Sequence, residues 1–239
     1  MKDLVALIER YRPGYSRTVE PASDFDIEDY DAEAGALPGA YVRFLQTMGR
    51  SIGDFNAHDV DFNVRNLVIT YQVAPWIQRD QFLLIGSDQG PTGVRYFLDR
   101  GAIDGKGDCM VVMSLRHPSL PLDPLDQLHV GLEEFLYVEA YRTVRLPLFA
   151  HRAELAPTPL VMDPRATAEN AFAVAERLGF ERVSPAQRSA LYERGDAALV
   201  LARRPTSDAF SLRIGATDPD ELARLISAFE DAVGVAGGQ

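Results

Sequence analysis

The sequence predicts an α+β protein in which helices pack on an antiparallel sheet. Three observations indicate this class. Apolar residues recur at helical spacing near the N-terminus, short apolar runs joined by Gly-bearing turns fill residues 81–115, and helical spacing returns at residues 168–178. Short strands joined by short turns favour an antiparallel meander, because parallel neighbours need a long crossover between them.

Two amphipathic helices are expected before residue 50. The second opens at Pro38, whose missing N–H costs nothing in a first turn, and Gly49 is its expected stop. The first ends at Arg12-Pro13-Gly14. Apolar stripes at helical spacing define the two helices and consist of Leu4, Leu7, Ile8 and Tyr11 in the first and Tyr41, Phe44, Leu45 and Met48 in the second.

The middle of the chain predicts three strands and a following helix. Residues 64–73 stay open between two interpretations, because Leu67, Val68 and Tyr71 have helical spacing whereas the β-branched content favours a strand. The strands are expected at 81–86, 94–99 and 110–115, and the helix at 132–141. The expected core includes Tyr41, Phe44, Phe82, Leu84, Tyr96, Leu98 and Phe135.

Four prolines between Leu146 and Pro164 predict a linker. We therefore expect a first domain at residues 1–150 and a smaller α/β domain at 151–239. The first holds 14 basic and 22 acidic residues, a net charge of −8, and the second holds 10 and 13, a net charge of −3. The acidity thus belongs mainly to the first domain.

The smaller domain is expected to follow the order ααββα. Ser184-Pro185 is typical of an N-cap followed by a first helical turn, so a helix is expected to begin there. The other expected elements are a helix at 168–178, strands at 197–202 and 210–214, a final helix from 218 to about 233, and a frayed tail at 235–239.

Composition and charge exclude several functions. The chain has 24 Lys+Arg against 35 Asp+Glu, a net charge of −11, which argues against binding of nucleic acid or an anionic membrane. Its single cysteine, Cys109, allows neither an intrachain disulfide nor a Cys-based zinc site. The sequence shows neither a signal peptide nor a membrane span, so we expect a cytoplasmic protein.

No sequence motif indicates catalysis, a cofactor or a metal. Residues 86–93 are glycine-bearing but lack the G-x-G-x-x-G spacing, and a strand follows, so we interpret them as a hairpin connection. His58 lies near Asp59 and Asp61, yet strand alternation would place it opposite both acids. No Ser or Cys pattern indicates a nucleophile beside a base. We therefore expect a protein that is not an enzyme and has no cofactor.

Residues 20–33 form an unbroken acidic segment, with no Lys or Arg between Arg17 and Arg43. The segment is too polar for a core, so we expect a solvated loop or the acidic start of a short helix. One interpretation is a merely solvated surface, and the other is a surface that binds a basic protein. The candidate residues of that surface are Glu20, Asp24, Asp26, Glu28, Asp29, Asp31 and Glu33.

Several motifs occur together between residues 27 and 142, namely Ile27, Glu33, Leu37-Pro38, Tyr41, Phe44-Leu45, Gly49, Phe82 to Asp88, Tyr96 to Asp99 and Leu132 to Leu136. In order and spacing they resemble the SUKH superfamily, which holds Smi/Knr-type cell-wall regulators and many bacterial toxin-immunity proteins. One departure is Val94, because family members often carry an acid after the last glycine of the hairpin loop. The C-terminal unit resembles no family that we recognise.

The resemblance implies a non-catalytic binding module, commonly an immunity protein that occludes a co-encoded toxin such as a nuclease. A nuclease binds phosphates through a basic surface, so an acidic inhibitor suits it. The alternatives are a regulatory or scaffold adaptor of the same fold without a toxin, and an enzyme whose site assembles in space. The oligomeric state is left open.

Overall fold

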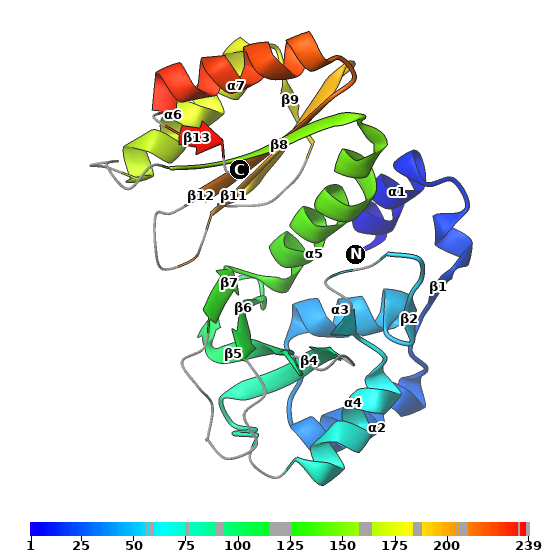
Figure 1. Ribbon diagram of the computed structural model, residues 1–239. Coiled ribbons are helices and arrows are strands. Elements are labelled where there is room, and N and C mark those ends of the chain that lie inside the picture. The colour runs from blue at the N-terminus through cyan, green and yellow to red at the C-terminus, as the bar shows by residue number, and fades with distance from the viewer. Residues whose placement is uncertain are drawn as a thin grey trace. The chain divides into compact units, whose positions relative to one another are not determined.

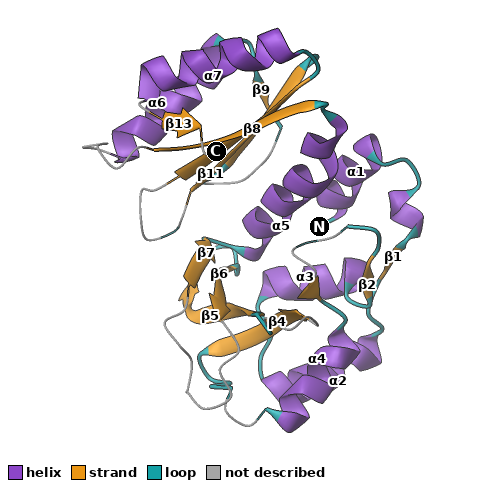
Figure 2. Cartoon of the chain, in the orientation of Figure 1, coloured by secondary structure: helices purple, strands orange, loops and turns teal. Residues whose placement is uncertain are grey.

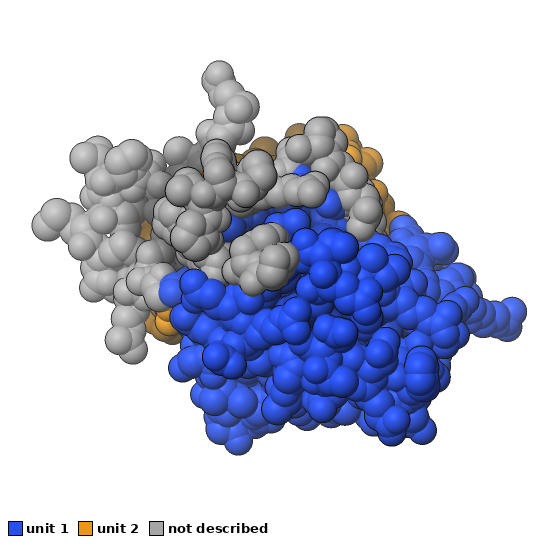
Figure 3. Space-filling model, turned by 90° about the horizontal axis from the view of Figure 1, so that it is seen from below, with its two compact units in different colours: residues 1–136 blue, residues 137–239 orange. Residues whose placement is uncertain are grey.

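A computed structural model describes residues 1–55, 57, 60–74, 77–88, 93–114, 126–157, 164–183, 188–203, 205, 210–233 and 235–237. The chain divides into two compact units, residues 1–136 and residues 137–239, which are coloured separately in Figure 3. Both units combine helices with antiparallel sheets, so the predicted α+β class is confirmed (Figures 1 and 2).

The first unit is built on a five-stranded sheet in the order β3-β4-β5-β6-β7. Chain neighbours are sheet neighbours and all pairs are antiparallel, so the predicted meander is confirmed. The strands are β3 (Val60–Asp61), β4 (Phe82–Asp88), β5 (Arg95–Ile103), β6 (Cys109–Ser114) and β7 (Asp126–His129). A separate two-stranded sheet pairs β1 (Val19–Glu20) with β2 (Ser51–Ile52).

The helices of the first unit include the segment that the sequence left undecided. Residues 64–73 form a helix because its inner face buries Val64, Leu67, Val68 and Tyr71, and Asn63 caps its first turn. The helices are α1 (Lys2–Tyr11), a 3₁₀ turn η1 (Tyr15–Arg17), α2 (Asp24–Ala34), α3 (Gly39–Met48), α4 (Val64–Val73) and the start of α5 (Leu132–Ala140).

The core of the first unit contains a chain of aromatic rings. Tyr41 stacks on Phe44 with ring centroids 5.6 Å apart, and Phe62 lies 5.9 Å from Phe44 and 6.5 Å from Phe135. Tyr96 contacts Phe135 at 5.8 Å, so the chain of rings joins α3, α5 and β5. All seven residues predicted for the core are exposed by 4% or less, which confirms that prediction.

Two buried tyrosines bind the backbone of β4 at Leu84. The hydroxyl of Tyr30 in α2 donates to the Leu84 carbonyl, and the Leu84 N–H donates to the hydroxyl of Tyr71 in α4 at 2.8 Å. Strand β3 pairs with β4 only at Ser87 and Asp88. The two hydroxyls therefore satisfy backbone groups that a longer β3 would have paired.

The second unit contains a six-stranded antiparallel sheet in the order β13-β8-β12-β11-β10-β9. Helices α6 and α7 contact each other, and Val174, Leu225 and Phe229 on them share a core with sheet residues Leu199 and Ile214. The elements are η2 (Tyr141–Arg145), η3 (Leu146–Leu148), β8 (His151–Pro157), α6 (Pro164–Arg177), β9 (Glu181–Arg182), β10 (Ala190–Arg194), β11 (Ala197–Arg203), β12 (Phe210–Ala216), α7 (Pro219–Val233) and β13 (Val235–Gly237).

The segment Tyr141–Phe149 is fastened to this sheet. The Tyr141 hydroxyl donates to the carbonyl of Tyr192 at 2.9 Å. Gly215 of β12 allows a close approach of Phe149, because a Cβ at residue 215 would lie 2.6 Å from the ring. Arg145 also binds Glu193 at 2.7 Å, so both polar and apolar contacts fix the segment.

The two units divide between Leu136 and Tyr137, inside α5, whereas the sequence predicts a division after residue 150. The described prolines of the expected linker lie within elements: Pro147 in η3, Pro157 at the end of β8 and Pro164 at the start of α6. A first helical turn and a strand end both tolerate the missing N–H of proline. Pro159 lies outside the described residues.

The order ααββα is corrected by the structure. Ala190–Arg194 is strand β10, where the helix expected from Ser184 would have continued. Ser184-Pro185 themselves lie outside the described residues. Five residues of β10 pair with β11 in a hairpin closed by Gly195-Asp196, and this ladder outweighs the capping signal at Ser184. The tail is also corrected, because Val235–Gly237 pairs with β8 as strand β13.

Candidate functional site

The acidic segment of the sequence lies on helix α2 and on the end of β1. The structure divides its seven acids by environment. Asp26 is buried and Glu33 is half-buried, whereas the exposed members are Glu20, Asp24, Glu28, Asp29 and Asp31.

Ser23 and Asp26 close the start of α2 with a capping box. The N–H of Asp26 donates to Ser23 Oγ at 3.2 Å, and the N–H of Ser23 donates to Asp26 Oδ2 at 2.9 Å. Both bonds satisfy backbone donors that a helix start leaves without partners. The sequence contains the signal for this role, since Ser23 and Asp26 have the spacing of a capping box.

The Asp26 carboxylate also forms two ion pairs. Arg50 Nε and Arg65 Nε each lie 2.8 Å from a carboxylate oxygen, so Asp26 joins α2 to α4 and to the residue before β2. Burial raises the pKa of Asp26, but hydrogen bonds from Arg50, Ser23 and Arg65 outweigh burial and hold the pKa well below its ordinary value. Because 3% of its side chain is exposed, Asp26 serves the fold and we leave it out of the candidate surface.

Two arginines close the other end of α2. Arg79 Nη1 donates to the Glu33 carbonyl at 2.8 Å, and its guanidinium lies 3.6 Å from the Glu33 carboxylate. Arg100 Nη2 donates to the carbonyls of Ala34 at 2.8 Å and Gly35 at 3.1 Å. A helix C-terminus carries partial negative charge, so these cations offset an unfavourable position for acids. Glu33 is therefore also bonded within the fold.

Four exposed acids remain on α2, and we call them the α2 acidic face. Three of them follow one another at i, i+4 and i+7 and form one stripe along the helix, with the fourth beside it. Among the described residues, no Lys, Arg or His nitrogen lies within 4.0 Å of their carboxylates. The face consists of Asp24, Glu28, Asp29 and Asp31.

Apolar side chains are also exposed on α2 and on α4, which packs against it. Phe25 is 72% exposed, Ile69 is 57% exposed and Val73 is 74% exposed. We call these three residues the α2–α4 apolar surface. The sequence analysis did not identify these residues. Phe25 lies within the acidic segment, and Ile69 and Val73 lie in residues 64–73, which stayed open between helix and strand.

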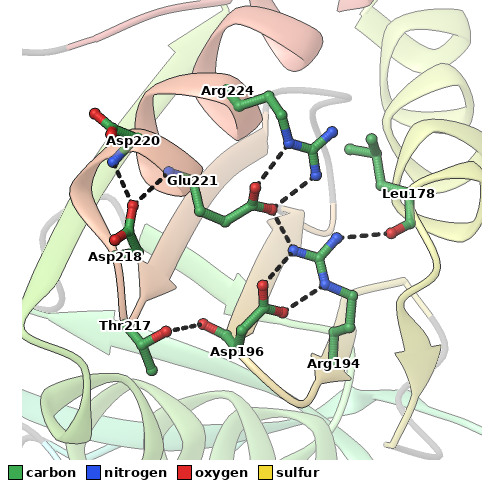
Figure 4. A network of polar contacts seen from close by, with 8 residues as sticks. All are labelled: Leu178, Arg194, Asp196, Thr217, Asp218, Asp220, Glu221 and Arg224. Carbon is green, nitrogen blue, oxygen red and sulfur yellow. Dashed lines mark hydrogen bonds and ion pairs between the residues drawn. The ribbon is translucent and has the colours of Figure 1, made fainter.

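A second charged cluster lies in the second unit, at the turn between β10 and β11 (Figure 4). Arg194 donates two hydrogen bonds to the Asp196 carboxylate, at 2.6 and 3.1 Å, and also binds Glu221 of α7. Arg224 donates two hydrogen bonds of 2.7 Å to the same Glu221 carboxylate. The hydrogen bonds from Arg224 and Arg194 lower the pKa of Glu221 to about 2, although burial opposes this.

Further hydrogen bonds tie this cluster to the helix ends (Figure 4). Arg194 Nη1 donates to the Leu178 carbonyl at 2.8 Å and so closes the end of α6. Asp218 Oδ1 accepts from the N–H groups of Asp220 and Glu221, at 2.8 and 3.2 Å, and caps the start of α7. The Arg194 cluster therefore serves the fold of the second unit.

Two groups of the first unit with potential reactivity, the Cys109 thiol and the Asp108 carboxylate, are buried. Burial and the carboxylate of Asp108 raise the pKa of Cys109 to about 11, so little thiolate forms near neutral pH. The Asp108 carboxylate accepts from the N–H groups of Leu132 at 2.9 Å and Glu133 at 3.1 Å, at the start of α5. The Asp108 carboxylate thus has structural partners, among them the N–H of Cys109 itself at 2.8 Å.

Within the described ranges, no group of three His, Cys, Asp or Glu residues is placed to hold a metal ion. His58 and Asp59, which the sequence analysis considered for this role, lie outside those ranges. None of the helices that the structure describes has the length and apolar character needed to cross a membrane.

Comparison of the chain with models of known protein families, with curated proteins and with solved structures found no match in any of the three. The resemblance to the SUKH superfamily stays a prediction from the sequence motifs. Asp24, Glu28, Asp29 and Asp31, with Glu20 before them, are the predicted site residues that remain available to a partner in solution.

Proposed function

We propose that this chain is a non-catalytic protein-binding module, a SUKH-type immunity protein that neutralises a co-encoded toxin in the cytoplasm. The observation that carries the proposal is the α2 acidic face, whose exposed carboxylates have no cationic partner among the described residues. Elsewhere, Asp26, Asp108 and Glu221 are each bonded within the fold. The acidic face is thus a charged cluster that the fold leaves available to a partner.

The negative charge of the α2 acidic face indicates which kind of partner it can bind. A helix with one stripe of carboxylates attracts a cationic surface over several ångströms and repels phosphate groups. A nuclease toxin needs a basic surface for its own substrate, so an acidic module that covers this surface blocks substrate entry without any chemistry. Electrostatic attraction of this kind raises association rates by about 10- to 1,000-fold at low salt.

The test reverses the charge of Glu28, Asp29 and Asp31 to Lys. Asp24 stays in place because it favours the first turn of α2, and Asp26 stays because it holds the fold. Association with the product of the adjacent gene is measured at two salt concentrations. We expect the on-rate at low salt to fall about tenfold or more and to depend less on salt.

A matched variant separates this face from net charge. Glu181, Glu230 and Asp231 of the second unit are also exposed, and changing all three to Lys alters the net charge of the chain by the same amount. We expect their on-rate to stay close to that of the wild type. Equal losses in both variants would contradict a role of α2. If the wild type does not bind the adjacent gene product, the immunity function is overturned and the adaptor alternative replaces it.

A further inference from the structure

The α2–α4 apolar surface has no task in the core of the first unit. The inner side of α4 packs through Val64, Leu67, Val68 and Tyr71, and the inner side of α2 packs through Tyr30 and Ala34. Phe25, Ile69 and Val73 project from the outer sides of these helices. Single exposed apolar residues are ordinary, whereas these three lie on two helices that pack against each other, and we take them together as the candidate interface.

The two helices are joined beside this surface. Arg65 of α4 reaches Asp26, the neighbour of Phe25 in the chain. From Arg65, Ile69 follows at i+4 and Val73 at i+8, so both continue the exposed side of α4 that begins at this ion pair. The Asp26–Arg65 contact therefore fixes the helices that carry the three apolar side chains.

We infer that a basic protein docks on the α2–α4 apolar surface, with Phe25 as its anchor and the α2 acidic face as its rim. The inference rests on the proposed function and adds to it the residues that hold the partner after encounter. Apolar anchors at the centre of an interface, inside a polar rim, dominate the binding energy of protein complexes.

The charge beside Phe25 favours a basic protein over a lipid, a nucleic acid or a second copy of the chain. Asp24 precedes Phe25 in the chain and Glu28 follows it one helical turn later, on a helix without a Lys or Arg. Phosphates of an anionic lipid or of a nucleic acid are repelled there. A second copy of the chain would bring its own acidic helix to the same place. A partner with an apolar pocket ringed by Lys and Arg satisfies both the apolar centre and the charged rim.

The anchor and the rim act on different rate constants. Truncation of an anchor leaves long-range attraction intact and speeds dissociation, whereas reversal of rim charges slows association. We therefore expect Phe25→Ala to raise the dissociation rate from the adjacent gene product by at least about tenfold, with an on-rate within about twofold of the wild type.

Ile69→Thr has a matched control in Ile103→Thr. Both isoleucines are 57% exposed, but Ile103 lies on β5 and not on α2 or α4. Threonine keeps the β-branch and removes apolar surface. We expect a faster dissociation for Ile69→Thr and an unchanged one for Ile103→Thr.

Several results would overturn the inference. If Phe25→Ala dissociates at the wild-type rate, Phe25 is not the anchor and the inference is wrong. The proposed function is unaffected by that result, because it depends on the acids. If the wild type does not bind the adjacent gene product, both the inference and the proposed function are wrong. Sedimentation that shows a dimer abolished by Phe25→Ala assigns the surface to a second copy. Binding of the wild type, but not of Phe25→Ala, to zwitterionic vesicles assigns it to lipid.

Discussion

The α2 helix of the first unit and the Arg194 cluster of the second are both rich in carboxylates, but differ in what balances the charge. In the cluster, Glu221 lies between Arg194 and Arg224, and Asp196 shares the Arg194 guanidinium. On α2, Asp26 is balanced in the same way, whereas the α2 acidic face has no such cation among the residues that the structure describes. The number of acids in a segment therefore does not show whether they stabilise the fold or are available to a partner. The position of the nearest guanidinium does distinguish these two roles.

The largest effect is expected where α2 resembles the Arg194 cluster. Asp26→Asn removes a buried charge from two arginines and should lower the free energy of unfolding by about 2–4 kcal/mol. The isosteric change Asp29→Asn on the exposed face should alter it by no more than about 0.5 kcal/mol. Urea unfolding of the two variants measures both. Similar midpoints would mean that the distinction between the two carboxylates is wrong.

A smaller effect is expected in the second unit. Arg194→Met keeps much of the side-chain volume but removes the hydrogen bonds to Asp196, Glu221 and the Leu178 carbonyl, for an expected loss of about 1.5–3 kcal/mol. Its control is Arg213→Met, because Arg213 pairs with the 54% exposed Glu154, and such pairs contribute about 0–1 kcal/mol. Thermal unfolding followed by circular dichroism compares them. An equal loss of stability in the two variants would contradict the structural role of the Arg194 cluster.

The smallest effect is expected on the stability of the chain at acidic pH. The pKa of Glu221 is about 2 in the folded chain against an ordinary value of 4.5, so below pH 4.5 the unfolded state binds more protons at this group. Stability from Glu221 is thus present above about pH 4.5 and lost as pH falls toward 2. Glu221→Gln should remove about 1–2 kcal/mol of this acid-side decline. The free energy of unfolding measured from pH 6 to pH 2.5 tests it, and an unchanged slope would contradict it.

Local patterns predicted the helices and strands whose own residues decide them. The helix was predicted from the stripe between Tyr41 and Met48, and the strand from the continuous apolar run that begins at Phe82, and both are confirmed. Residues 64–73 became a helix because Tyr71 and its neighbours fit the core, and residues 190–194 became a strand because β11 pairs with them. The core that selects the helix cannot be read from the local sequence, whereas the hairpin turn Gly195-Asp196 is a local signal that the sequence analysis did not use.

The candidate site was predictable as a segment but not residue by residue. The acidic run identifies α2, and the Ser23–Asp26 spacing indicates a cap. The ion pairs that bury Asp26 come from Arg50 and Arg65, which lie 24 and 39 residues further along the chain. Only the fold brings them together, so sequence alone placed Asp26 among the exposed acids.

The tyrosine hydroxyls at Leu84 have a consequence for association between chains. An unpaired strand margin is a template on which another molecule can add a strand, and this addition begins many aggregates. Tyr30 and Tyr71 occupy the carbonyl and the N–H of Leu84, just before the bulge in β4. Where β3 is too short to cover β4, two phenol groups thus satisfy the Leu84 backbone and leave neither of its polar groups free to pair with a strand of another chain.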